Sequence, residues 1–146
     1  MTRATTKDAE IFLRLMDLLN TPQMQESGKW FMKEFSANDY EEFKTKYPMG
    51  SEGYTNVSVM LASLETAGVL VSQGLLNENL YFDASGIEFI WTRLEKIIPE
   101  WQKDAGPALW ENAVWLAERQ KQWKKDVWKP KLAWKPQRPG ATRRGR

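Results

Sequence analysis

The longest regular pattern of apolar positions lies between residues 54 and 101 and predicts two helices joined by a short turn. Apolar residues recur at helical spacing in the first helix, at Val57, Met60, Leu61, Leu64, Ala67 and Val71. In the second helix they step by three or four residues, at Leu80, Ala84, Ile87, Trp91, Leu94, Ile98 and Trp101. Gly74 supplies a stop, and an asparagine of the following LLNEN run caps the next start. We expect the rest of the chain to pack around this pair.

Shorter amphipathic segments precede the central pair. Thr5 or Thr6 can cap a helix that runs through Asn20. Thr21, followed by proline at the first helical position, opens a second helix to about Phe35. These two segments add helices whose apolar stripes can pack on the central pair.

The other predicted helices are short or contain residues that interrupt a helix. Asn38 is expected to cap a short helix, DYEEFKTKY. The DASG run at 83–86 is a weak point in the long second helix, and Pro99 distorts its distal end. A last helix follows Pro107, with its stripe at Leu109, Ala113, Leu116, Gln120 and Trp123. Together the segments predict an all-α fold, an irregular helical bundle of about five to six helices.

Charge divides the chain into two parts. Residues 1–118 carry 10 basic and 18 acidic side chains, a net charge of −8, whereas residues 119–146 carry 11 basic and one acidic, a net charge of +10. From Trp128 onward prolines and glycines replace the periodic apolar residues. We therefore predict a helical domain over 1–127 and a flexible basic tail over 128–146, disordered when free.

The amino-acid composition excludes several kinds of catalytic and metal-binding site. The absence of cysteine excludes a disulfide framework and thiolate sites, and the absence of histidine removes the commonest general base and transition-metal ligand. The first ten residues lack the apolar run of a secretory signal, and no uninterrupted apolar stretch approaches 18 residues. We expect a soluble, cytoplasmic protein with no cofactor.

The central stretch resembles a bacterial family known as the domain of unknown function 4760. The segments that carry this resemblance are NVSVMLASLETAGVLVSQGLLNENLYFD, the aromatic helix with Trp91 and Pro99, and NAVWLAERQKQW. It covers about Asp8 to Trp123 and so excludes the basic tail. The resemblance implies an all-helical fold; the family has no established activity, so no site residue carries over.

A winged-helix regulator is an alternative interpretation of the same stretch. Leu61, Leu64, Glu65 and Gly68 fit loosely a leucine-rich pattern that precedes a β-hairpin in such proteins. No alternating β-ribbon follows Gly74, and residues 54–95 carry one arginine against five acids. Such a surface would repel phosphate, which counts against this interpretation.

Two other groups of side chains are candidate sites. The clustered carboxylates Asp39, Glu41 and Glu42 lack a nucleophile, metal motif or phosphate loop beside them, so a small-molecule enzyme is a weak hypothesis and we expect no enzyme. Trp110 and Trp115, five residues apart, cannot face the same core, so one is expected at the surface. Exposed tryptophan-bearing helices of this kind suggest self-association.

The basic tail is the strongest candidate site. It interleaves cationic and aromatic residues, namely Lys124, Lys125, Trp128, Lys129, Lys131, Trp134, Lys135, Arg138, Arg143, Arg144 and Arg146. Lysine and arginine contact anionic groups, and tryptophan can stack on bases or lie at a membrane interface. We expect a non-enzymatic interaction or adaptor protein whose tail contacts an acidic protein surface, nucleic acid or an anionic membrane. The competing interpretation is a disordered solubility tail, or a tail that folds back onto the acidic body.

Overall fold

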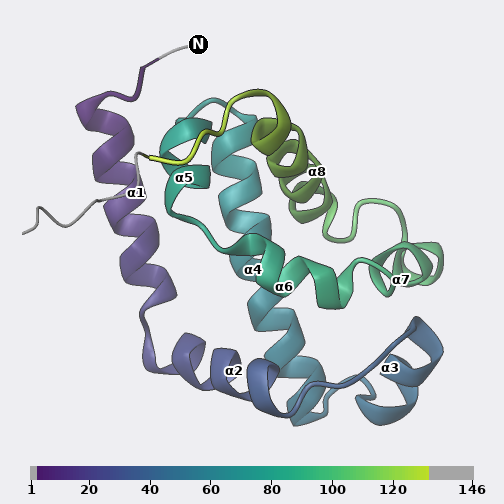
Figure 1. The fold of residues 1–146 in the computed structure, drawn as a ribbon. Coiled ribbons are helices and arrows are strands. Elements are labelled where there is room, and N and C mark those ends of the chain that lie inside the picture. The colour runs from purple at the N-terminus through teal and green to yellow at the C-terminus, as the bar shows by residue number, and fades with distance from the viewer. Residues whose placement is uncertain (1–2, 132–146) are drawn as a thin grey trace, which may run out of the picture.

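The computed structural model describes residues 3–131, and these residues form helices only (Figure 1). In chain order the helices are α1 (Thr6–Leu19), α2 (Pro22–Lys33), α3 (Tyr40–Lys46), α4 (Glu52–Ser72), α5 (Glu78–Ala84), α6 (Ile87–Leu94), α7 (Ile98–Ala105) and α8 (Glu111–Asp126). The predicted all-α class is confirmed. Because the described residues contain no strand, no β-hairpin follows Gly74.

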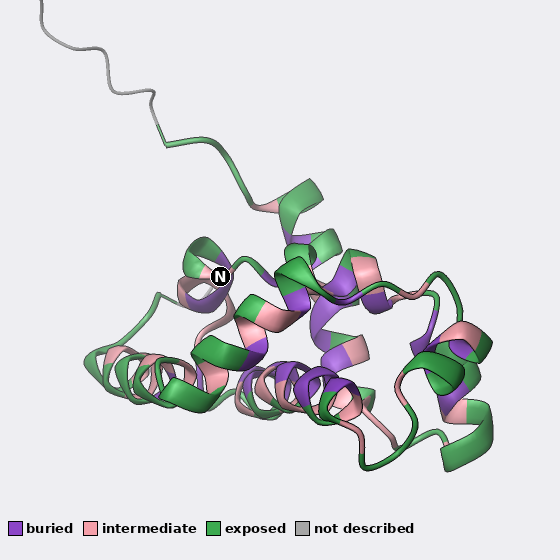
Figure 2. Ribbon diagram, turned by 90° about the horizontal axis from the view of Figure 1, so that it is seen from below, coloured by how far each residue is buried: buried purple, intermediate pink, exposed green. Residues whose placement is uncertain are grey.

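Helix α4 is the centre of the molecule, as the apolar pattern predicted (Figure 1). It packs mainly against α2 and α8. All six residues of its predicted stripe, from Val57 to Val71, are buried. The buried residues line the inward sides of the helices (Figure 2). By length and mean hydropathy α4 could cross a membrane, but a core helix has the same composition, and its apolar stripe packs inside this fold.

The helix count is higher than predicted, because one long helix over 80–101 is three short ones. Ser85 has an extended backbone that ends α5, and Gly86 precedes α6. Pro99 lies in the first turn of α7, where its missing N–H costs nothing, so it starts a helix rather than distorting one. Five of the seven predicted stripe residues, from Ile87 to Trp101, are buried, whereas Ala84 is exposed.

Most predicted helix starts are correct. The Thr5, Thr21 and Asn77 side chains accept hydrogen bonds from the first turns of α1, α2 and α5. Two starts differ from the prediction. The last helix begins at Glu111 rather than directly after Pro107. Asp39 rather than Asn38 caps α3, its carboxylate accepting from the Glu42 N–H at 2.8 Å. A carboxylate at this position also favours the positive end of the helix dipole.

Helix α8 lies close to α4 because Gly68 has no side chain. A Cβ atom on Gly68 would lie 2.3 Å from the backbone oxygen of Asn112. The predicted stripe of α8 is buried at Ala113, Leu116, Gln120 and Trp123. Trp115 is 40% exposed, while Trp110 packs edge-on against Trp101, so the predicted division between these two tryptophans is confirmed.

Candidate functional sites

The structure describes five of the eleven predicted tail residues, namely Lys124, Lys125, Trp128, Lys129 and Lys131. The other six, Trp134, Lys135, Arg138, Arg143, Arg144 and Arg146, lie outside the described residues. Helix α8 ends at Asp126, with Lys124 and Lys125 in its last turn, where their charges favour the negative end of the helix dipole. The basic segment therefore begins on a packed helix.

Two lysines of the basic segment, Lys124 at the end of α8 and Lys131 of the tail, contact acidic side chains of the body. The Lys124 ammonium lies 2.5 Å from a Glu88 carboxylate oxygen, and the Lys131 ammonium lies 2.5 Å from an Asp83 oxygen. Asp83 belongs to α5 and Glu88 to α6, so the contacts bridge the break between these helices. Lys125 and Lys129 have no carboxylate within ion-pair distance among residues 3–131. The start of the tail thus lies along an acidic edge.

A groove of about 470 Å³ lies beside this edge, between the start of α1, α5 and the end of α8. Leu80, Trp123 and Val127 give it an apolar lining. The indole N–H of Trp123 donates to the Asn79 side chain at 2.6 Å, which fixes the buried ring. Trp128 also lines the groove but is 47% exposed. An aromatic face is therefore available next to the tail's lysines.

The clustered carboxylates of α3 have structural partners. Asp39 caps the helix, and Glu41 pairs with Lys44 at 2.9 Å. Glu42 lies 2.7 Å from the Lys46 ammonium, and this contact, with the hydrogen bond from the Asn38 N–H, lowers the pKa of Glu42. No group of three or more potential metal-ligating side chains occurs in the described part of the chain.

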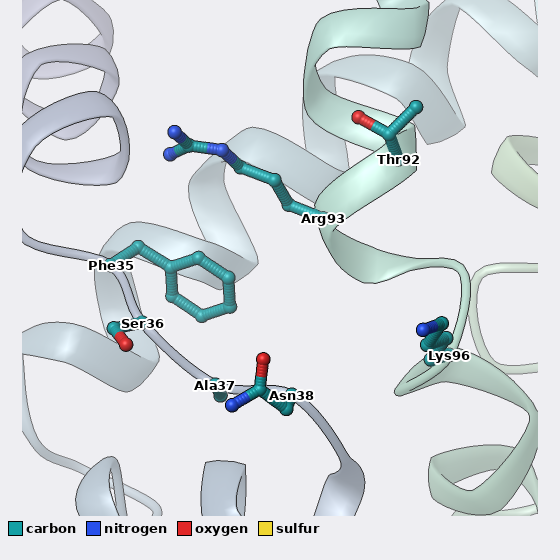
Figure 3. Close-up of a pocket in the computed structure, with 7 residues that line it drawn as sticks. All are labelled: Phe35, Ser36, Ala37, Asn38, Thr92, Arg93 and Lys96. Atoms are coloured by element: carbon teal, nitrogen blue, oxygen red, sulfur yellow. The ribbon is translucent and has the colours of Figure 1, made fainter.

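A second candidate site is a polar hollow of about 310 Å³ (Figure 3). Residues 35–38, which connect α2 to α3, form one side. Thr92 and Arg93, from the last turn of α6, and Lys96 form the other. The fold thus brings two cationic side chains to a segment that lies more than 50 residues earlier in the sequence.

Sequence reasoning missed this hollow. Arg93 stood out as the single cation of residues 54–95, but nothing in the sequence indicated which segment it would face. The hollow forms where the segment after the end of α2 at Lys33 meets the end of α6 at Leu94, and this meeting is a property of the folded chain.

A family model described as a domain of unknown function, DUF4760, matches residues 4–120. The chain belongs to the DUF4760 family. The predicted resemblance is therefore confirmed. Comparisons with curated proteins and with solved structures found no match.

The boundaries of the DUF4760 domain separate the two candidate sites. Arg93, Lys96 and the segment 35–38 lie inside the matched range. Lys124 and all later tail residues lie beyond its end at residue 120. The hollow therefore lies inside the matched range, and the basic segment lies outside it.

Proposed function

We propose that this DUF4760 protein is a non-enzymatic interaction protein, in which an acidic helical body carries a basic C-terminal segment that contacts an anionic partner. The observation that carries the proposal is the pairing of Lys124 with Glu88 and of Lys131 with Asp83. Both pairs involve solvent-exposed side chains, so each contributes at most about 1 kcal/mol and exchanges readily.

Because these two ion pairs are weak and solvent-exposed, the basic segment can leave the acidic side chains of the body and bind another anionic partner. A surface with densely spaced anionic groups offers the lysines more contacts than two isolated carboxylates do, and nucleic acid in addition gains from release of its bound counterions. Lys125 and Lys129, which have no carboxylate partner within residues 3–131, are available to such a surface at no cost in broken ion pairs. The body's own acidic edge then acts as a weak competitor.

Single-stranded nucleic acid is the second, more specific candidate, and Trp128 favours it. An exposed indole flanked by Lys129 supplies both a stacking face and a phosphate contact. Stacking of this kind tolerates any base sequence, so binding would depend on salt more than on sequence.

The test is titration of the full chain with three anionic probes: a labelled single-stranded oligonucleotide, anionic lipid vesicles and polyglutamate. We expect saturable binding of at least one probe that weakens as salt increases. Changing Lys124, Lys125, Lys129 and Lys131 to alanine should flatten that salt dependence. Binding to none of the probes at low ionic strength would overturn the proposal. Equal salt dependence for the parent and the quadruple variant would also overturn it.

A further inference from the structure

An aromatic pocket of about 280 Å³ opens where α3, the start of α4 and α7 meet. Aromatic rings make up most of its lining, namely those of Tyr40, Phe43, Tyr47, Tyr54 and Trp101. The rings pack on one another, with centroid distances of 5.0 Å between Phe43 and Trp101 and 5.6 Å between Tyr54 and Trp101. Met49 also lines the pocket and is 84% exposed, so the pocket opens to solvent.

Contacts outside the aromatic pocket hold its walls in place. The Tyr47 hydroxyl accepts from the Ser36 N–H at 3.1 Å, and the Tyr47 ring stacks with Phe35 at 5.7 Å. Phe43 and Trp101 are buried. Because these rings are already fixed, they lose little conformational entropy when a ligand packs on them. Aromatic-lined grooves bind proline-rich segments in this way, so the lining favours a segment that contains proline.

One edge of the aromatic pocket carries an excess of negative charge. The Lys44 ammonium lies 2.9 Å from a Glu41 oxygen and 3.5 Å from an Asp104 oxygen. One positive and two negative charges leave this edge with a net charge of −1. Both acidic side chains are exposed. A cation beside the bound proline would supply the missing positive charge.

The basic tail contains a segment with both properties. Residues 135–139 read Lys-Pro-Gln-Arg-Pro, so each of the two prolines follows a cation. These residues lie outside the described part of the chain. A polyproline II helix has three residues per turn, so in that conformation Pro136 and Pro139 fall on the same side. The net charge of +10 over residues 119–146 also complements the −8 of residues 1–118.

The tail of the same molecule does not reach the aromatic pocket while Lys131 is paired with Asp83. The pocket includes Tyr54, in the first turn of α4, whereas the described chain ends beside α5, near the other end of α4 (Figure 1). With 21 residues, α4 is about 30 Å long. The chain from Lys131 to Pro136 spans at most about 18 Å. The tail of a second copy has no such limit.

We propose that the aromatic pocket binds residues 135–139 of a second copy of this chain. The two prolyl rings pack on the rings of the pocket, and a cation of the segment lies at the edge formed by Glu41 and Asp104. The contact is head-to-tail, because different surfaces of the two copies meet. It uses neither the lysines between 124 and 131 nor the groove at Trp128. It can therefore fail while the proposed function stands, and the reverse also holds.

The experiment is sedimentation equilibrium of the full chain at low salt, over concentrations up to the millimolar range. We expect the average mass to rise with concentration. Pro136→Ala with Pro139→Ala should weaken this association about tenfold, because each change removes two methylene-sized groups from the contact. Pro130→Ala is the matched control, since Pro130 also follows a lysine but lies outside the segment. A chain that stays monomeric throughout, or equal losses in the two proline variants, would overturn the proposal.

Charge variants test the aromatic pocket without changing its rings. Glu41→Gln with Asp104→Asn removes the two exposed carboxylates and should weaken association by about two- to fivefold at low salt. The loss should shrink as salt rises. Glu10→Gln with Glu26→Gln changes the net charge equally at exposed positions of α1 and α2 and should weaken association less. Equal losses in the two double variants would contradict a contact at this edge.

A mixture of two weakened variants shows whether the contact joins two copies. The Pro136/Pro139 variant keeps the parent's pocket, and the Glu41/Asp104 variant keeps the parent's tail. Together they can form one complete contact, so the labelled mixture should associate more strongly than either variant alone. No gain on mixing would rule out the contact between copies. The Pro136/Pro139 variant has an unchanged charge and should bind the oligonucleotide, vesicles and polyglutamate as the parent does, which separates this contact from the proposed function.

Discussion

The Glu65 carboxylate accepts a hydrogen bond from the backbone N–H of Ala113, at 2.9 Å, across 48 residues of sequence. Its other oxygen accepts from the Asn112 side chain at 2.8 Å. Helix α8 needs this because its own N-cap residue, Trp110, has a left-handed backbone and makes no side-chain capping bond. A residue in the middle of α4 therefore caps the start of α8, and it fixes how the two helices meet.

Removing this carboxylate should destabilise the fold. For Glu65→Ala we expect a loss of about 1.5–3 kcal/mol in the free energy of unfolding, since the bonds involve a charged acceptor at a helix N-terminus. Glu65→Gln keeps one acceptor and should lose less. Urea denaturation measures both, and Glu26→Ala is the matched control, because Glu26 is an exposed helical glutamate on α2. Equal midpoints for Glu65→Ala and Glu26→Ala would contradict the capping role.

Two glycine substitutions should have opposite effects. Gly68→Ala would place a methyl group 2.3 Å from the Asn112 oxygen, a backbone atom that cannot move without shifting α8. We expect a loss of about 3 kcal/mol or more. Gly28→Ala lies within α2 with no atom within 4 Å of the added Cβ, so it should stabilise by roughly 0.5–1 kcal/mol. Thermal denaturation of the pair tests the close contact of α4 and α8; two effects of the same sign would argue against it.

The tryptophans provide a test of the core. Trp91 is buried in α6, and truncation to alanine should cost roughly 3–5 kcal/mol. Trp115, at 40% exposure, should cost far less. Trp134, which lies outside the described residues, is also predicted to cost little because prolines at 130 and 136 flank it. Chemical denaturation midpoints that coincide for the Trp91 and Trp115 variants would be incompatible with this core.

Acid should weaken the attachment of α1. The Asp8 carboxylate accepts hydrogen bonds from Thr5 and, at 2.7 Å, from the Asn77 N–H at the start of α5. The bonds from Thr5 chiefly lower the pKa of Asp8 below its ordinary 3.8. A lowered folded-state pKa means that the stabilisation is complete above the unfolded value and is lost as pH falls through the folded value. Unfolding midpoints between pH 6 and pH 3 should therefore fall less steeply for Asp8→Asn than for the parent chain. Glu10→Gln should retain the parent slope.

Local patterns predicted the all-α class and where most helices lie, but not the division of residues 80–101 into three helices or how the helices meet. Apolar spacing located the α4 stripe, and threonine and asparagine caps located three helix starts, because these signals act within a few residues. The prediction was wrong where two local rules competed. Pro99 was interpreted as a distortion inside a helix, although it starts α7, and Asn38 was chosen over its neighbour Asp39.

Long-range pairings left no trace in the sequence pattern. Nothing in the sequence indicated that Glu65 would accept a hydrogen bond from the start of α8. Nor did the sequence indicate that Arg93 would donate to the Phe31 carbonyl at the end of α2. The tail was recognisable from charge alone, because its basic residues are consecutive in the chain. The specific carboxylates that its first lysines contact, Asp83 and Glu88, could be found only from the fold.

The acidic edge should compete with an anionic partner for the tail. Changing Asp83 to Asn and Glu88 to Gln removes both carboxylates that pair with Lys131 and Lys124. At low salt we expect oligonucleotide affinity to rise by about two- to fivefold for each lost pair, in line with exposed ion pairs of up to about 1 kcal/mol.

The salt dependence of binding, and a variant with the same change in net charge, test whether the two lost ion pairs cause the gain in oligonucleotide affinity. If about six of the 11 basic residues of 119–146 contact phosphate, log affinity should fall with log salt at a slope of about −4 to −5, and the gain should shrink as salt rises. Glu10→Gln with Glu26→Gln changes the net charge equally but removes no pairing with the tail. A similar gain in this control would mean that overall charge, rather than the edge at α5 and α6, sets the affinity. No gain in either double variant would show that the two ion pairs do not restrain the tail.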